Sequence, residues 1–191
     1  MSALRKLLRA SGLAAVSGGL LLLAACATAS MPTQMVATPG TVTSAAVGDP
    51  GFKQLRIGAV QGGSATNPLW MSNVSNADFK TALESSLRAL NYLADDAAKA
   101  RIEVTASLVA LKRPLAGIDM SVTSTVRYSA LPTLGGAAVL DETLAATGTA
   151  KFGEALLGVE RLRKANEASM RANIEVFVKQ LQDALKKYPA G

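Results

Sequence analysis

The stretch RIEVTASLVAL, residues 101–111, and the stretch DMSVTSTVRY, residues 119–128, alternate apolar and polar side chains along most of their length. Successive side chains of a strand point to opposite faces of its sheet, so this alternation predicts two half-buried β-strands. The inward positions are expected to be Ile102, Val104, Ala106, Leu108 and Ala110 in the first strand, and Met120, Val122, Val126 and Tyr128 in the second. Pro114 and Gly117 lie between the two runs, which predicts an antiparallel hairpin.

Weaker signals on either side extend this hairpin into a larger sheet. Residues 53–60 place Leu55, Ile57 and Ala59 on one side and polar residues on the other, which predicts a strand before the hairpin. Residues 139–151 follow a Pro and Gly turn and are rich in Thr and Ala. They predict a third meander strand at or near a sheet edge, although their pattern does not assign its faces.

A first helix is predicted after Ser75, because Ser75 or Asn76 can cap its free N–H groups and Asp78 suits the positive end of its dipole. Its apolar stripe is expected to consist of Phe79, Leu83, Leu87 and Leu90.

A second, longer helix is predicted at residues 154–187. Three acidic residues precede basic residues by four positions, which indicates a solvated face: Glu160 and Lys164, Glu167 and Arg171, Glu175 and Lys179. A stripe of mostly small residues (Val159, Leu162, Ala165, Ser169, Ala172, Val176) should allow close approach to the sheet. The apolar surface of the second half consists of Met170, Ile174, Phe177, Leu181 and Leu185, and either packing on the first helix or a partner-binding face explains it.

The order strand, helix, three strands, helix predicts an α+β fold, a two-layer sandwich. It would have a four-stranded, mostly antiparallel sheet with two helices on one face. A right-handed crossover would place the first strand beside a later one in parallel.

The N-terminal segment has the pattern of a secretory signal. Arg5, Lys6 and Arg9 precede an uncharged apolar stretch at residues 13–25, which is too short to span a bilayer as a helix. The sequence Leu23-Ala24-Ala25-Cys26 then resembles the lipobox of bacterial lipoproteins. This resemblance implies diacylglycerol on the Cys26 sulfur, cleavage before Cys26 and an N-acyl chain on the freed amine. The alternative is an ordinary signal peptide cut at an A-x-A-like site such as Ala25-Cys26-Ala27, which would leave Cys26 free or remove it.

The predicted organisation is a signal peptide at residues 1–25, a lipidated flexible tether at residues 26–52 and a single α+β domain at residues 53–191. The tether is predicted from a composition of Thr, Ser, Ala, Pro and Gly with little periodicity. The alternative is an irregular arm that packs on the domain and adds Met31, Met35 and Val36 to a surface.

The composition excludes several classes of chemistry. The chain has no histidine and its one cysteine is Cys26, so catalytic dyads and triads based on histidine, and the usual zinc sites, have no candidate residues. We therefore expect no enzyme activity, no bound metal, and no cofactor other than the acyl groups on Cys26. Half of the formal net charge of +6 comes from Arg5, Lys6 and Arg9, and no basic cluster interleaved with aromatic residues suggests nucleic-acid binding.

The region from residue 53 to 185 resembles small envelope lipoproteins of proteobacteria, on three motifs taken as a set: Asn67-Pro68-Leu69-Trp70, Gly117-Ile118-Asp119-Met120 and Val159-Glu160-Arg161-Leu162. The resemblance extends to auxiliary lipoproteins of ABC transporters and to the lipopolysaccharide-assembly lipoprotein. Such chains are sometimes named UDP-N-acetylglucosamine acyltransferase, but that enzyme family uses a hexapeptide-repeat helix and a catalytic histidine, which this chain lacks.

These features predict a non-catalytic, lipid-anchored envelope protein, an accessory subunit that docks on a membrane-protein complex in lipid or glycolipid transport or envelope maintenance. The expected location is the outer membrane of a Gram-negative bacterium, facing the periplasm, because Ala27 is not the Asp that retains lipoproteins in the inner membrane of enteric bacteria. A binding module for an amphipathic lipid or glycan is the alternative, and an acyltransferase is a remote one. Besides Cys26, the candidate partner or ligand surface consists of Trp70, Met170, Ile174, Phe177 and Leu181.

Overall fold

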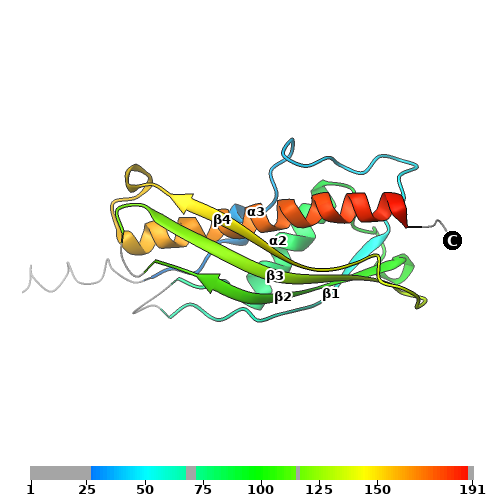
Figure 1. Cartoon of the computed structure of the whole chain (residues 1–191), viewed down its shortest axis with the longest axis horizontal. Helices are drawn as coiled ribbons and strands as arrows, with labels where there is room; N and C mark the ends of the chain where they lie inside the picture. The colour runs from blue at the N-terminus through cyan, green and yellow to red at the C-terminus, as the bar shows by residue number, and fades with distance from the viewer. Residues whose placement is uncertain (1–26, 68–71, 115–116, 189–191) are drawn as a thin grey trace, which may run out of the picture.

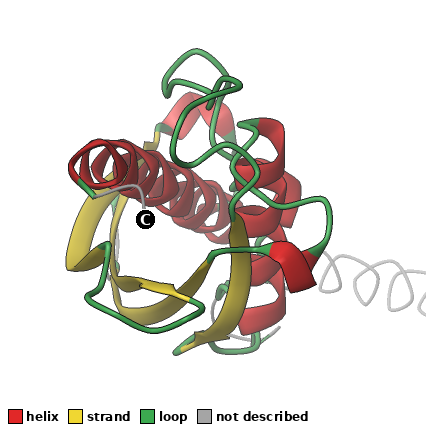
Figure 2. Cartoon of the chain, turned by 90° about the vertical axis from the view of Figure 1, so that its right-hand side faces the viewer, coloured by secondary structure: helices red, strands yellow, loops and turns green. Residues whose placement is uncertain are grey.

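The computed structural model describes residues 27–67, 72–114 and 117–188. Its strands are β1 (Leu55–Gln61), β2 (Ile102–Lys112), β3 (Met120–Pro132) and β4 (Leu140–Ala150), and its α-helices are α2 (Asn76–Ala89) and α3 (Gly158–Lys187). Three short 3₁₀ turns are η2 (Pro32–Gln34), η3 (Ala97–Lys99) and η4 (Phe152–Glu154). The sheet order is β1-β2-β3-β4, and the two helices lie on the same face of the curved sheet (Figures 1 and 2). The predicted α+β two-layer fold is confirmed.

The predicted hairpin is present, with one correction. β2 and β3 pair antiparallel, and side chains at Val104, Ala106 and Tyr128 point into the core. The register shifts between Leu108 and Ala110, so the bulge leaves Val109 exposed. Beyond the bulge, the adjoining Leu111 packs against the core. The expectation that Ala110 continues the inward row was therefore wrong, because an extra residue reverses the alternation.

The outer strands also follow the predicted topology. β1 pairs parallel with β2, and α2 forms part of the connection between them. β4 pairs antiparallel with β3 along the sheet edge. The Oγ atom of Ser75 accepts the N–H of Asp78 at 3.1 Å, which is the capping expected at the start of α2. Phe79, Leu83 and Leu87 are fully buried, as the apolar stripe predicted.

Helix α3 begins four residues later than predicted. The residues before it form η4, in which the N–H of Lys151 donates to the Glu154 carboxylate at 2.8 Å. Ala155 is extended, with φ at −161°, so the helical conformation cannot continue from η4 into α3. A local capping interaction therefore competes with the helix at this point.

The small-residue stripe of α3 makes the close approach that its composition predicted. Ser169 lies against the sheet, where its Oγ accepts the N–H of Ser124 at 2.9 Å and donates to the carbonyl of Ala146 at 3.2 Å. A Cβ atom added to Gly148 of β4 would collide with the backbone at Ala168 and Ser169. Glycine is therefore required where α3 crosses β4.

The core lies between the sheet and the helices. Tyr128 of β3 stacks on Phe177 of α3 with ring centroids 4.1 Å apart, and it makes an edge contact with Phe79 of α2 at 6.4 Å. The Tyr128 hydroxyl donates to the Asn173 Oδ1 atom at 3.0 Å, so this buried polar group is satisfied. The three rings thus connect both helices to the centre of the sheet.

The N-terminal segment, predicted as a flexible tether, packs on the domain. Met35 is fully buried, and Ala37, Val42 and Ala45 also belong to the core. We call residues 27–54 the N-terminal arm. It lies along α2 and α3 and ends where β1 begins (Figure 1). The tether prediction was wrong because one deeply buried methionine and several small apolar residues, spaced without periodicity, are enough to bind an irregular segment.

Hydrogen bonds fix this arm at several points. The N–H of Ala37 donates to the Ser86 hydroxyl of α2 at 2.9 Å, and the N–H of Thr38 donates to the Glu175 carboxylate of α3 at 2.9 Å. The arm is also bound at the end of α2, where the N–H of Ala45 donates to the carbonyl of Leu90 at 2.8 Å. Within the described ranges, no helix is both long and apolar enough to cross a membrane.

Candidate functional site

The site residues predicted from the sequence do not form one partner or ligand surface in the described structure. Cys26 and Trp70 lie outside the described residues. The other four, Met170, Ile174, Phe177 and Leu181, are fully buried in the main core. They therefore do not form a partner or ligand surface, because α2, the sheet and the N-terminal arm cover the apolar side of α3. These residues pack in the core, against the sheet as well as against α2.

The first half of α3 differs most from the prediction of a solvated, charged face. Arg163 and Glu167 are both buried, and the Arg163 Nη1 atom lies 2.7 Å from the Glu167 Oε1 atom. Arg163 also forms an ion pair with Glu160. The predicted partners Glu167 and Arg171 both bind the N-terminal arm instead, since Glu167 accepts the N–H of Met31 and Arg171 donates to the carbonyl of Gln34.

Glu167 is the centre of this junction. Its Oε1 atom accepts the N–H of Met31 at 2.8 Å as well as the Arg163 guanidinium. Burial raises the pKa of the Glu167 carboxyl, with the hydrogen bond from Met31 and the charge of Arg163 acting in the opposite direction. By contrast, the hydrogen bond from Arg163 lowers the pKa of the more exposed Glu160.

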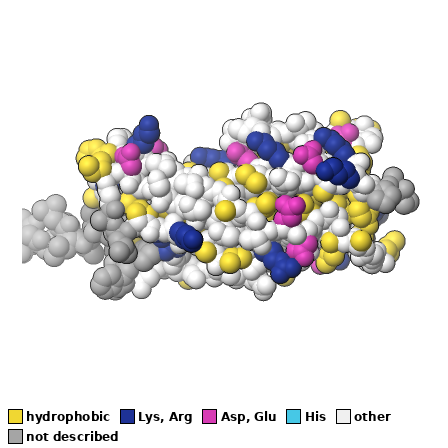
Figure 3. Space-filling view, in the orientation of Figure 1, with side chains coloured by type: hydrophobic (Ala, Val, Ile, Leu, Met, Phe, Trp, Pro, Cys, Tyr) yellow, Lys and Arg dark blue, Asp and Glu magenta, His cyan; other side chains and the backbone are white. Residues whose placement is uncertain are grey.

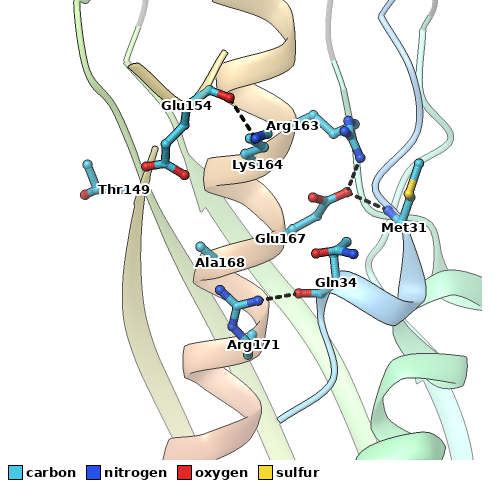
Figure 4. Close-up of a pocket in the computed structure, with 9 residues that line it drawn as sticks. All are labelled: Met31, Gln34, Thr149, Glu154, Arg163, Lys164, Glu167, Ala168 and Arg171. Atoms are coloured by element: carbon cyan, nitrogen blue, oxygen red, sulfur yellow. Dashed lines mark hydrogen bonds and ion pairs between the residues drawn. The ribbon is translucent and has the colours of Figure 1, made fainter. Parts of the chain in front are cut away.

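A cavity of about 360 Å³ adjoins this junction, between the arm, α3 and the end of β4 (Figure 4). In the close-up, Glu167 lies between Arg163 and the backbone of Met31, while Arg171 reaches the carbonyl of Gln34 at 3.0 Å. Lys164 donates to the carbonyl of Glu154 at 2.8 Å. The polar groups around the cavity therefore hold the arm and the loop before α3 in place, and the arrangement serves as a structural joint.

The ion pair in this joint is only weakly indicated by the sequence. Arg163 and Glu167 are spaced for an i to i+4 ion pair, but such pairs usually lie on solvated helix faces. Only the folded arm shows that this pair is covered.

A larger and more apolar cavity lies at the opposite end of the molecule, where α3 ends. It has a volume of about 730 Å³ and is lined by Ile102, Pro132, Leu134, Leu185 and Tyr188, with Arg101 and Asp49 among its polar groups. A neighbouring cavity of about 680 Å³ shares Tyr188 and extends along Val139 and Leu140. These volumes fall in the range of small-molecule sites, and the mixture of apolar walls and a few charges suits an amphipathic ligand.

No cluster of three or more carboxylate, histidine or cysteine side chains that could hold a metal ion occurs in residues 27–67, 72–114 and 117–188. The buried acid of the joint, Glu167, is already paired with Arg163.

No family model matches this sequence, and no curated protein matches it. Its fold is similar to solved structures at low sequence identity. A candidate lipoprotein from Caulobacter crescentus CB15 is 12% identical, with a TM-score of 0.51 over 72% of this chain and 95% of that one. A Xanthomonas campestris protein described under the family model DUF330 is 10% identical, with a TM-score of 0.56 over 84% of this chain and 98% of that one. At this identity the likeness establishes a shared fold alone.

Proposed function

We propose that this chain is a non-catalytic lipoprotein of the Gram-negative cell envelope, anchored through acyl groups on Cys26. The observation that carries the proposal is the sequence Leu23-Ala24-Ala25-Cys26 after a charged and then apolar segment, directly before the folded chain. Two or three acyl chains hold a protein on a bilayer far more firmly than one myristoyl chain does. The similar fold of a candidate lipoprotein from Caulobacter crescentus supports the proposal.

The decisive test is the mass of the N-terminal peptide of protein taken from its native membranes. A peptide that begins at Cys26 and carries a diacylglycerol and an N-acyl chain is expected. The variant Cys26→Ala should remain unprocessed, whereas Ser30→Ala should be acylated as in the wild type. An unmodified cysteine on protein that is found in the soluble fraction would refute the anchor.

The membrane in which the anchor lies is a separate part of the proposal. We propose the outer membrane, with the domain on the periplasmic side, because Ala27 follows Cys26. Separation of the membranes by density should recover the wild type with the outer membrane, and Ala27→Asp should move the protein to the inner membrane. The same distribution for both variants would contradict this assignment.

Within the envelope, we propose an accessory role: docking on a membrane-protein complex in lipid or glycolipid transport or envelope maintenance. A chain without histidine and with its only cysteine acylated has few groups for general acid and base catalysis. This favours the accessory role over the acyltransferase activity after which similar chains are sometimes named. Mild crosslinking in cells followed by affinity purification should recover one defined membrane complex. Recovery of the monomer alone would count against the role.

The apolar cavity at the end of α3 favours a second candidate, a binding module for an amphipathic lipid or glycan. Leu134 is 99% exposed beside it, so Leu134→Asp should weaken lipid retention without loss of folding. Native mass spectrometry of protein released from membranes measures this retention, with Val109→Asp, at a residue that is 60% exposed and lies outside this cavity, as the matched control. Equal occupancy of both variants, or no bound lipid in the wild type, would exclude this cavity as the site.

A further inference from the structure

Four large apolar side chains are exposed at one end of the molecule. Ile118 is 75% exposed in the connection between β2 and β3, and Phe152, Leu156 and Leu157, which are 53%, 86% and 52% exposed, lie between β4 and α3. The two segments are joined, because the N–H of Phe152 donates to the Asp119 carboxylate at 3.0 Å. We call these four side chains the basal patch; part of it forms the apolar cluster at the left end of Figure 3.

The N-terminal arm begins at this same end. The N–H of Ser30 donates to the carbonyl of Asn73 at 3.3 Å, and the Asn73 side chain accepts from Arg113, the residue after β2, at 2.7 Å. Ala27 is three residues from Ser30, hence at most about 11 Å away, and it is itself buried. The described chain therefore starts beside the connection that carries Ile118, whereas α3 ends at the opposite end (Figure 1).

This placement leaves no spacer between the anchor and the domain. Cys26 directly precedes Ala27, and the arm that follows is held by Met31, Met35 and Thr38 rather than free. A domain whose first residue is buried must lie within a few residues' reach of whatever holds Cys26. If the acyl groups are in a bilayer, this end of the domain meets the headgroups.

We propose that the basal patch inserts into the interface of the bilayer that holds Cys26, so that the domain stands on its end. The inference rests on the proposed lipid anchor. Phenylalanine and leucine side chains are suited to the boundary between headgroups and acyl chains. The four side chains of the basal patch would hold a free protein only weakly, but the anchor makes their insertion an intramolecular step with a high effective concentration.

Charges at the rim of the patch fit this orientation. Lys151 and Glu154 are exposed on either side of Phe152, and Asp119 is exposed beside Ile118. The Arg161 guanidinium lies 5.0 Å from the centre of the Phe152 ring and donates to the carbonyls of Ala155 and Leu156, which fixes the loop that carries the leucines. The apolar tips are thus presented by a fixed loop, with polar groups left at headgroup level.

The test uses the full, acylated chain in vesicles of phosphatidylethanolamine and phosphatidylglycerol. Because Cys26 is consumed by acylation, Leu156→Cys supplies a single thiol for an environment-sensitive fluorophore. Leu134→Cys, at the opposite end and 99% exposed, is the matched control. Lipids with a spin label near the headgroup should quench the fluorophore at position 156 at least threefold more strongly than the one at position 134.

The outcomes separate this inference from the anchor. Protein that floats with the vesicles and carries an acylated Cys26, but shows equal and weak quenching at both positions, would overturn the basal patch while leaving the anchor intact. Protein that does not float would refute the anchor itself. In addition, replacing both leucines, Leu156→Ser with Leu157→Ser, should reduce quenching of a label at Ile118→Cys without releasing the protein; unchanged quenching would also overturn the inference.

Discussion

Glu167 is a residue of α3 whose burial and hydrogen-bond partners are changed by the N-terminal arm. In a helix alone it would be a solvated partner of Arg171, but here it is buried and accepts the N–H of Met31 and the guanidinium of Arg163. Its protonation therefore bears on the stability of the joint.

The raised pKa of Glu167 has a defined consequence for stability. The Glu167 carboxyl binds its proton more tightly in the folded state than in the unfolded state. The contribution of this proton to the free energy of unfolding is therefore complete below the unfolded pKa of about 4.3, and it is lost as the pH rises through the folded pKa. Glu167→Gln keeps an acceptor for Met31 and removes the titration. We expect the unfolding free energy of the wild type, relative to that of Glu167→Gln, to fall in urea titrations as the pH rises above the unfolded pKa. A relative increase would mean that Arg163 outweighs burial.

Asn173 is the buried polar residue on which the core depends. Its Nδ2 atom donates to the carbonyls of Ser124 and Leu144 at 3.2 and 3.0 Å, and its Oδ1 atom accepts from the hydroxyl of Tyr128. Asn173→Ala leaves these groups unpaired and should cost about 1–3 kcal/mol in urea unfolding. Adding Tyr128→Phe should recover part of this loss, since it removes one orphaned group; a purely additive loss would argue against their coupling.

At the scale of elements, the N-terminal arm is a structural part of the domain rather than a spacer. Met35→Ala should reduce the unfolding free energy by about 2–5 kcal/mol, because the side chain is fully buried against the core. Met31→Ala is the matched control: Met31 lies in the same arm but is 48% exposed, and its replacement should change stability by less than about 0.5 kcal/mol. Equal, negligible effects would show that the arm is free in solution.

The contact between α3 and β4 allows a second test of element packing. Gly148→Ala would place a Cβ against the backbone of α3, so helix and sheet would have to move apart. We expect a loss of about 1–3 kcal/mol or more in chemical denaturation. Gly153→Ala, where nothing lies within 4 Å of the added atom, should leave stability nearly unchanged. A neutral Gly148→Ala would disprove the close approach.

At the scale of the whole molecule, the two ends differ in character. The basal patch and the start of the arm lie at one end, and the apolar cavity lies at the other, where α3 ends. The 30 residues of α3 span about 45 Å between these ends. An upright domain would therefore present its cavity well beyond the headgroups, toward partners in the surrounding space.

This orientation predicts a measurable height. The acylated protein on a supported bilayer should protrude by about 45 Å in atomic force microscopy, the length of α3. A variant with both Leu156→Ser and Leu157→Ser should give a broader and lower distribution, because the upright state loses its apolar contacts. A uniform height of about half this value for the wild type would show that the domain lies flat.

Much of the fold could be predicted from local patterns. The strands and helices follow from alternation, apolar stripes and the Ser75 cap, since each depends on neighbours in the chain. The bulge after Leu108 and the late start of α3 could not be predicted, because both arise where a local hydrogen-bonding arrangement interrupts a regular period. The candidate site residues on α3 were wrong as a surface because an apolar stripe does not reveal what covers it.

By itself, the sequence determined the secondary structure order, the α+β class and the absence of histidine, because composition and periodicity are properties of neighbouring residues. Only the tertiary structure decided that residues 27–54 pack on the helices, that Arg163 and Glu167 are buried, and that the basal patch lies where the chain begins. The physical reason is that burial of an irregular segment depends on contacts between residues more than a hundred positions apart, such as Met31 with Glu167, and no local pattern records them.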